Sequence, residues 1–217
     1  MRKFESNVQY TKYLVNKEIA KRYINGEKLE DVVDDIAETI IPGPEPLTRC
    51  CIYKERHIVK ERAKFAIEPL EGDNVIHILT SACDECPVDR YVVTEACRGC
   101  LAHKCHEVCP KDAIMIVGQR AYINQHMCIE CGRCKDACPF TAISDVQRPC
   151  LRSCGAGAIV IDTNKKAYID EEKCVSCGAC VYQCPFGAIV DKSYVVDTLE
   201  LIKNSEGNTK YKVYAIV

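Results

Sequence analysis

Residues 128–139 read CIECGRCKDACP, and residues 174–185 read CVSCGACVYQCP. Both segments have the spacing C-x2-C-x2-C-x3-C-P, and the four cysteines of the first match those of the second at a constant offset of 46 positions. Residues 97–110, CRGCLAHKCHEVCP, repeat the pattern with two extra residues before the third cysteine. Three thiolates in one tight loop can reach three irons of a cubic cluster, and the fourth, before Pro, turns to a neighbouring cluster. The spacing therefore predicts paired iron–sulfur clusters.

The repeat extends beyond the cysteines. Four segments share one ending: CPKDAI (109–114), CPFTAI (138–143), CGAGAI (154–159) and CPFGAI (184–189). Apolar strands, RAYI and KAYI, precede the loops at 128 and 174. This is the spacing of bacterial ferredoxins with two clusters. We therefore expect an α+β chain in which a helical N-terminal region (1–90) is followed by two tandem ferredoxin-like units (91–145 and a degenerate 146–190), and then by a helix and a strand (191–217).

The ligand sets follow from the crossing of the last cysteine of each loop. The first [4Fe–4S] cluster is expected to take Cys97, Cys100, Cys105 and Cys138. The second is expected to take Cys128, Cys131, Cys134 and Cys109. In the second unit, Cys154 lies 20 positions before Cys174, as Cys109 lies 19 before Cys128, so the third set is Cys174, Cys177, Cys180 and Cys154.

A fourth cluster is incomplete within the repeat. Cys150 and Cys184 hold two of its ligand positions, but Ser144 and Gln147 stand where the first two cysteines would fall. We hypothesise that Cys83 and Cys86, in the segment CDECP, complete the set. Cys50 and Cys51 are less favoured substitutes and are interpreted as structural cysteines.

Other metal and thiol chemistries fit the pattern less well. Zinc sites built from two C-x2-C pairs usually separate the pairs by a dozen or more residues, whereas here three cysteines fall within seven. The start of the chain has no apolar segment of a secretory signal, so a cytoplasmic location and reduced thiols are expected. His103 and His106 fall in a loop that already has four cysteines and are interpreted as non-ligands.

Composition and net charge argue against several classes of partner. The net charge of −2 gives no basic surface for nucleic acid. No run of eighteen apolar residues exists, so no membrane span is expected. No nucleophile or acid–base pair is evident, so no catalytic residue is predicted. The remaining function is single-electron transfer to or from a redox partner, such as a ferredoxin-like donor or acceptor.

The flanks show helical spacing. Val8 to Ile24, Leu29 to Ile40 and residues 52–67 each carry an apolar stripe, and PGPEP at 42–46 breaks the chain. The charged run 54–64 is interpreted as the solvent face of the third helix, with no binding role. A helix is expected at 191–203, and the segment YKVYAIV (211–217) is expected to form a strand that needs a sheet to join. The strand either pairs with a local edge or, as we favour, is the first strand of a C-terminal domain that is cut off here.

The order of segments resembles a known family. The chain is similar to the N-terminal, electron-feeding part of group B monomeric [FeFe] hydrogenases. The segments that carry this resemblance are the helical start, IIPGPEPLTRCCIYKERHIVKER, EACRGCLAHKC, the cysteine runs and a terminal YAIV strand. The resemblance covers nearly the whole chain. It implies a covalent C-terminal domain that binds the hydrogen-activating cluster, but the TSCCP and MPC motifs of that domain do not occur here. This chain alone is therefore not expected to make or oxidise hydrogen.

Three other functions stay open. A free-standing polyferredoxin, or a small electron-transfer subunit of a redox complex, has the same cluster chemistry with a different partner. A redox or oxygen sensor would use cluster loss as its signal, but no DNA-binding motif accompanies the cysteines. A structural zinc module is the last alternative, and metal content distinguishes it from the others.

Overall fold

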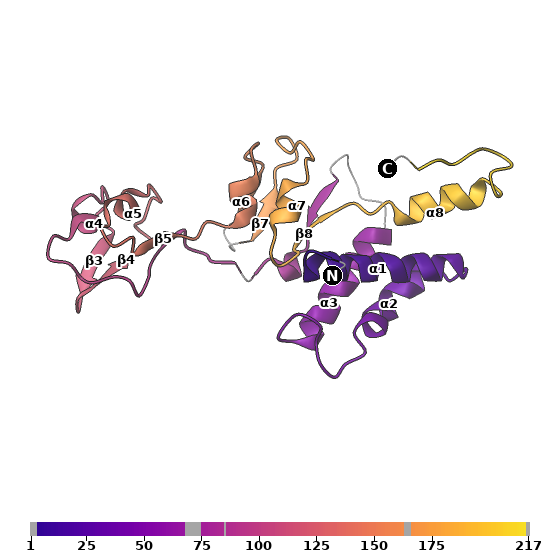
Figure 1. Ribbon diagram of the computed structural model, residues 1–217, viewed down its shortest axis with the longest axis horizontal. Coiled ribbons are helices and arrows are strands. Elements are labelled where there is room, and N and C mark those ends of the chain that lie inside the picture. Colours follow the sequence, from indigo (N-terminus) through magenta and orange to yellow (C-terminus); the bar gives the residue numbers. More distant parts are fainter. Residues whose placement is uncertain (1–3, 68–74, 85, 163–165, 216–217) are drawn as a thin grey trace. The chain divides into compact units, whose positions relative to one another are not determined.

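The computed structural model describes residues 4–67, 75–84, 86–162 and 166–215 (Figure 1). Helices and short strands are both present, as expected for an α+β chain. The chain divides into two compact units. Unit 1 consists of residues 1–85 and 153–217, whereas unit 2 is the continuous stretch 86–152.

Three helices open unit 1 where the apolar spacing predicts them: α1 (Asn7–Ile24), α2 (Leu29–Ile40) and α3 (Ile52–Ile67). The Ser6 hydroxyl caps α1 by accepting a hydrogen bond from the Gln9 N–H, at 3.3 Å. The three helices bury one apolar core formed by Val15, Ile19, Val32, Ile36, Ala37, Ile41, Val59, Ala63 and Ala66. Burial of these side chains is the main stabilising contribution of this part of the chain.

Two charged residues of α3 contradict the interpretation of 54–64 as a solvent face. Glu55 is 3% exposed and Arg62 is 8% exposed. Glu55 accepts hydrogen bonds from the Leu47 N–H (2.7 Å) and the Thr48 N–H (2.9 Å), and Arg62 donates to the carbonyl oxygen of Gly187 at 2.6 Å. The segment before α3 thus contacts Glu55, and a turn 125 positions further along the chain contacts Arg62. Helical periodicity within 54–64 could show neither contact.

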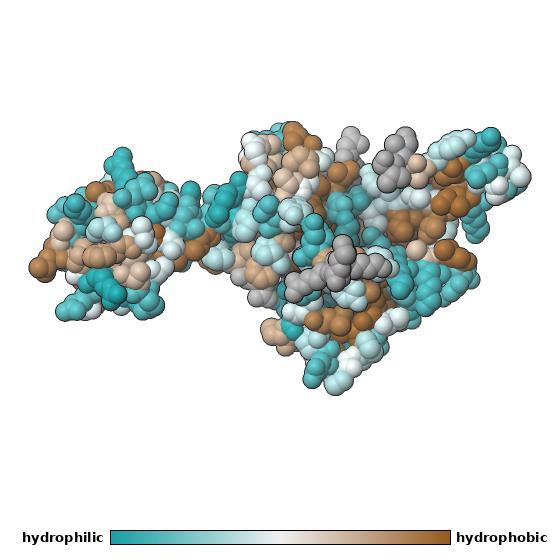
Figure 2. Space-filling model, in the orientation of Figure 1, coloured by the Kyte–Doolittle hydropathy of each residue, from teal (hydrophilic) through white to brown (hydrophobic). Residues whose placement is uncertain are grey.

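Helix α8 (Val195–Asn204) confirms the helix expected after the second unit. Val195 and Val196 pack against the three-helix core. Further along α8, Leu201 is 56% exposed and Ile202 is 50% exposed, and Figure 2 shows hydrophobic side chains at the surface of this helix. Residues 211–215 form no strand, and residues 216 and 217 lie outside the described residues, so the predicted terminal strand is not observed in 211–215.

Unit 2 contains the elements β2 (Tyr91–Val93), α4 (Lys104–Glu107), β3 (Ile114–Val117), β4 (Arg120–Ile123), α5 (Arg133–Ala137) and β5 (Ile143–Asp145). Strands β3 and β4 form an antiparallel hairpin, with Ile114 opposite Ile123. Strands β2 and β5 pair antiparallel, with Tyr91 opposite Asp145. A small core of Tyr91, Ile114, Ala121, Cys134 and Ile143 lies between these elements.

The remaining elements are β1 (Ile76–Ile78), the 3-10 turn η1 (Thr80–Ala82), α6 (Pro149–Ser153), β6 (Ile159–Ile161), β7 (Ala167–Ile169), α7 (Ala179–Gln183) and β8 (Ile189–Asp191). In unit 1, β6 and β7 form an antiparallel hairpin, as β3 and β4 do in unit 2. Strand β1 pairs antiparallel with β8. The sequence predicted no strand at β1, because three residues are too short to show a period.

The β1–β8 pair reproduces the β2–β5 pair in detail. The Leu79 N–H donates to the Ala188 oxygen at 2.7 Å, and the Thr94 N–H donates to the Ala142 oxygen at 2.8 Å. Ala188 and Ala142 are related by the same offset of 46 as the cysteine loops. Strand β1 therefore has in unit 1 the place that β2 has in unit 2.

Within the described residues, no helix combines the length and apolar character that crossing a membrane requires.

Candidate metal centres

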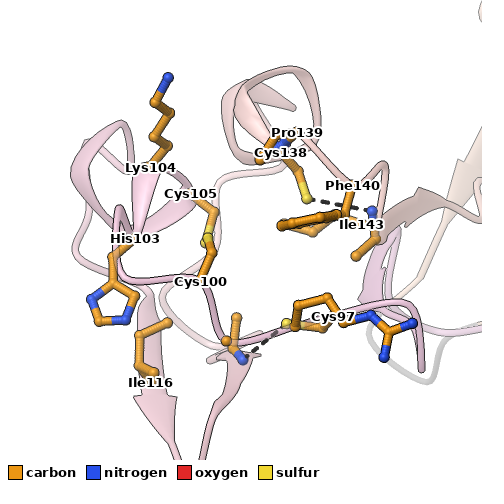
Figure 3. Close-up of a pocket in the computed structure, with 14 residues that line it drawn as sticks. Cys97, Cys100, His103, Lys104, Cys105, Ile116, Cys138, Pro139, Phe140 and Ile143 are labelled. Atoms are coloured by element: carbon orange, nitrogen blue, oxygen red, sulfur yellow. Dashed lines mark hydrogen bonds between the residues drawn. The ribbon is translucent and has the colours of Figure 1, made fainter.

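The first pocket lies in unit 2 and is lined by Cys97, Cys100, Cys105 and Cys138. These are the four cysteines expected to bind the first cluster. Cys138 comes from the loop after α5, whereas the other three belong to the loop around α4. Figure 3 shows the cysteine side chains around a common space, with the side chains of His103 and Lys104 pointing away from the Cys138 sulfur.

The second pocket also lies in unit 2 and is lined by Cys109, Cys128, Cys131 and Cys134. Cys109 follows α4, and the other three cysteines form the loop that leads into α5. The two pockets of unit 2 therefore exchange their fourth cysteines. This is the crossing that the sequence spacing predicts.

The third pocket lies in unit 1 and is lined by Cys154, Cys174, Cys177 and Cys180. Cys154 follows α6, and the other three cysteines lead into α7. Ile76 of β1 also lines this pocket, much as Tyr91 of β2 lines the second pocket. The strand that the sequence did not predict thus forms part of a candidate site.

A backbone N–H is directed at the sulfur of each cysteine that ends a loop. In the four segments with a common ending, the alanine four residues after the cysteine donates to Sγ: Ala113 to Cys109 (3.2 Å), Ala142 to Cys138 (3.4 Å), Ala158 to Cys154 (3.2 Å) and Ala188 to Cys184 (3.3 Å). The residue before each alanine has a positive φ: Asp112 (47°), Thr141 (49°), Gly157 (63°) and Gly187 (62°). The shared ending is therefore a turn that presents an N–H to sulfur, and such bonds stabilise and tune a bound cluster.

The inserted residues of the first loop are accommodated without loss of its turn. Gly132 (φ 79°) and Gly178 (φ 75°) lie two residues before the third cysteine of their loops, at the start of α5 and α7. His103 has the same relation to Cys105 and the same left-handed conformation, with φ 41°. The sequence did not reveal this role, because histidine is an unusual residue at positive φ.

Burial raises the pKa of the thiols of Cys105, Cys134 and Cys180. Each is the third cysteine of its loop. For Cys105, the nearby sulfurs of Cys138 and Cys100 also raise the pKa. A bound metal replaces these thiol protons, so metal binding at these sites releases protons.

The four cysteines hypothesised to bind a fourth cluster fall in both units. Cys83 (8% exposed) follows η1 and Cys184 (8% exposed) precedes β8, both in unit 1. Cys86 and Cys150 belong to unit 2. The fourth ligand set therefore stays a prediction. Cys50 is exposed and Cys51 is half-buried.

The residues present suit a [4Fe–4S] cluster in three places. Each of the three pockets offers four thiols from two loops, at least one N–H bonded to sulfur, and isoleucine and alanine side chains in its lining. None of the eighteen cysteines, all of which the structure describes, forms a disulfide. In the described parts of the chain, no three His, Cys, Asp or Glu side chains lie so that they could hold a single metal ion.

Two family models match the chain. Residues 167–190 match a 4Fe-4S binding domain, and residues 101–148 match the LdpA Fe-S cluster-binding domain. The first match contains three cysteines of the third pocket, and the second contains all four cysteines of the second pocket. The models cover a minority of the chain, but both fall on the cysteine loops.

Curated relatives decide the family. A seven-iron ferredoxin of Hydrogenibacillus schlegelii is 45% identical over 53 residues, which are 24% of this chain and 68% of the relative. The chain belongs to the ferredoxin family. A ferredoxin of Saccharopolyspora erythraea is 42% identical over 53 residues, which are 24% of this chain and 50% of that protein. The electron transport protein HydN of Escherichia coli K12 is 41% identical over 61 residues, which are 28% of this chain and 35% of HydN.

Family membership confirms the coarse functional prediction. The chain is an iron–sulfur protein of the ferredoxin type, with [4Fe–4S] clusters as cofactors and electron transfer as its function. The matched segments are about a quarter of the present chain. They span about half or less of two of the three relatives described.

Proposed function

We propose that this ferredoxin relays single electrons through at least three [4Fe–4S] clusters, held in the first, second and third pockets. The observation that carries the proposal is the composition of these pockets. Each collects four cysteines, three from one loop and one from another. When bound, a [4Fe–4S] cluster supplies one-electron chemistry at a potential within roughly −700 to +450 mV.

The protein's own residues set the conditions of transfer. The alanine N–H groups that donate to Sγ offset negative charge at the thiolates. In the first pocket, the Ala121 N–H also donates to the Cys97 sulfur, at 3.5 Å. Side chains such as Ile116 and Ile143 line the same pocket and exclude water from it. Fixed donors and a dry lining reduce the solvent rearrangement that each change of charge requires.

The second two-cluster unit is proposed to be discontinuous along the chain. Its first strand and first two cysteines precede residues 91–145, and its other cysteines follow them. Strand β1 takes the place of β2, and Cys83 and Cys86 follow β1 as Cys97 and Cys100 follow β2. Cys150 lies in α6 as Cys105 lies in α4, each four residues before a crossing cysteine. The Ala188 N–H bond gives Cys184 the turn of the other crossing cysteines. These equivalences support Cys83, Cys86, Cys150 and Cys184 as the ligands of a fourth cluster.

The larger context is proposed to be electron input to an [FeFe] hydrogenase. The resemblance of the flanking segments supports this proposal, with residues 1–90, 91–145, 146–190 and 191–217 as its successive parts. The exposed Leu201 and Ile202 on α8 offer an apolar surface that a following domain could cover. The alternative is a free-standing polyferredoxin or an electron-transfer subunit, located in the cytoplasm, which exchanges electrons with a separate redox partner.

Two experiments test these proposals. Anaerobically purified protein is expected to be brown and to contain about 12 iron atoms per chain for three clusters, or about 16 for four. Zinc in place of iron would refute the relay. Determining the coding sequence beyond Val217 tests the context: a continuing reading frame with cysteine motifs supports the hydrogenase, and an immediate stop codon supports the free-standing carrier.

A further inference from the structure

A cavity of about 430 Å³ in unit 1 has no part in the proposed electron relay. It lies between the start of α1, the segment before α3, α3 itself and the turn after Cys184. Its lining includes Thr11, Thr48, Arg49, Glu55, Arg62 and Gly187. The cavity contains none of the cysteines assigned to a cluster.

Arg62 is the unusual member of this lining. Its side chain is more than nine-tenths buried, and one guanidinium nitrogen, Nη2, donates to the Gly187 oxygen at 2.6 Å. Its Nε has no hydrogen-bond partner among the described residues. A buried guanidinium with an unmade hydrogen bond is costly unless a ligand completes it. Burial lowers the pKa of Arg62, which is the direction expected for a cation held away from water.

The acidic group of the lining is already engaged elsewhere. The Glu55 carboxylate accepts hydrogen bonds from the Leu47 N–H (2.7 Å), the Thr48 N–H (2.9 Å) and the Thr48 hydroxyl (2.5 Å). Asp191 and Cys184 favour the charged form of Arg62 electrostatically, and Arg49 opposes it. Asp191 is itself ion-paired with Lys12 at 2.5 Å. The hydrogen bond that Arg62 lacks is therefore not supplied by these acids.

Other residues of the cavity lining also favour an anion. Arg49 lines the cavity and donates to the Phe186 oxygen at 2.8 Å. Asn7, Val8 and Thr11, from the first turns of the 18-residue helix α1, also line it. The start of a helix carries partial positive charge and favours anions. Gly187 lets Arg62 approach closely, because a Cβ there would lie 3.1 Å from Nη2 and 2.8 Å from a methyl group of Val8.

We propose that this cavity binds a small oxyanion, with the Arg62 guanidinium group as its central donor. A guanidinium group suits the paired oxygens of a phosphate or a carboxylate. The cavity volume limits the ligand to a small molecule. The anion would neutralise the excess positive charge of the lining and complete the hydrogen bonding of Arg62.

The test is calorimetric titration of the full, cluster-loaded chain with inorganic phosphate and, separately, with acetate, under anaerobic conditions and at constant ionic strength set with chloride. One saturable site per chain is expected for at least one of the two anions. Arg62→Gln should weaken binding at least tenfold. Lys21→Gln removes the same charge from a side chain that is 63% exposed on α1, and it should leave the affinity unchanged.

Two further variants keep the test independent of folding. Arg62→Lys retains the charge without the planar guanidinium group and should also weaken binding. Thr11→Glu places a carboxylate in the cavity and should compete with the added anion, although Arg62 is intact. Iron content and far-ultraviolet circular dichroism report whether each variant has folded. Absence of saturable binding, equal affinity in Arg62→Gln and the parent, or binding that chloride removes to the same degree in every variant would overturn the proposal.

Discussion

Gly99 lies in the first cysteine loop, and its replacement by alanine should damage the first pocket. A Cβ at this position would lie 2.1 Å from the carbonyl oxygen of Gln119 and 2.3 Å from its carbonyl carbon. Gln119 belongs to the turn between β3 and β4. The left-handed conformation of Gly99 (φ 53°) is only part of the obstacle, because Glu130 (φ 55°) and Ser176 (φ 53°) adopt it at the equivalent positions of the other loops.

The size of the effect follows from the geometry. Ordinary contact with a Cβ begins at 3.4 Å, so the loop and the β3–β4 turn must separate by about 1.3 Å. Overpacking of this kind costs about 1–3 kcal/mol, and placing alanine in the left-handed region adds about 1–2 kcal/mol. The displaced turn leads directly into β4, whose Ala121 N–H donates to the Cys97 sulfur. Gly99→Ala is therefore expected to lower stability by about 2–5 kcal/mol and to weaken cluster binding in the first pocket.

The assay compares iron per chain and the midpoint of chemical unfolding under anaerobic conditions. Gly99→Ala should lose about four iron atoms, which is the content of one cluster. Gly118→Ala is the matched control, because Gly118 lies in the same β3–β4 turn with φ 51° and a Cβ added there would have no atom within 4 Å. It should keep its iron and lose only the conformational part of the cost. If Gly99→Ala retained the iron and stability of Gly118→Ala, the close approach of Gln119 would have no role in the site.

Three further substitutions test the remaining assignments. Cys109→Ser should remove the spectroscopic signal of the cluster in the second pocket and spare the first pocket, although Cys109 ends the first loop; the reverse pattern would contradict the crossing of ligands. Cys83→Ala should lower iron by about four atoms per chain if a fourth cluster exists, whereas Cys50→Ala should not; unchanged iron in Cys83→Ala would remove Cys83 from the ligand set. Glu55→Ala leaves two backbone N–H groups without their acceptor and should lower the free energy of unfolding, measured by chemical denaturation, by about 2–4 kcal/mol. The control Glu38→Ala changes a side chain that is 68% exposed and should lower it by less than about 1 kcal/mol.

Repetition made the cysteine loops predictable from sequence. Because the same spacing occurs twice intact and once with an insertion, the partner of each crossing cysteine could be assigned by counting residues. The structure brings together the twelve cysteines of the three expected sets in three pockets. Helices α1, α2 and α3 were predictable for a different reason, since their buried residues recur at the period of the helix.

The features that sequence could not predict depend on contacts between distant segments. Strand β1 has three residues and is defined only by its pairing with β8. The burial of Arg62 depends on the turn at Gly187, 125 positions further along the chain. The left-handed conformation of His103 (φ 41°) is a separate case, because histidine is an unusual residue at positive φ and the sequence does not indicate it. Local patterns carry no signal for interactions of this kind.

The pairing of β1 with β8 also has a consequence for the order in which the chain matures during synthesis. Ile78 ends β1, and Ile189, which begins β8, is added 111 residues later. At about 5–20 residues per second, β1 is synthesised roughly 6–22 s before its partner strand. Unit 2, by contrast, contains both members of each of its strand pairs in one continuous stretch. The middle of the polypeptide can therefore fold and receive metal while the backbone edge of β1 is still unpaired, before β8 has been synthesised.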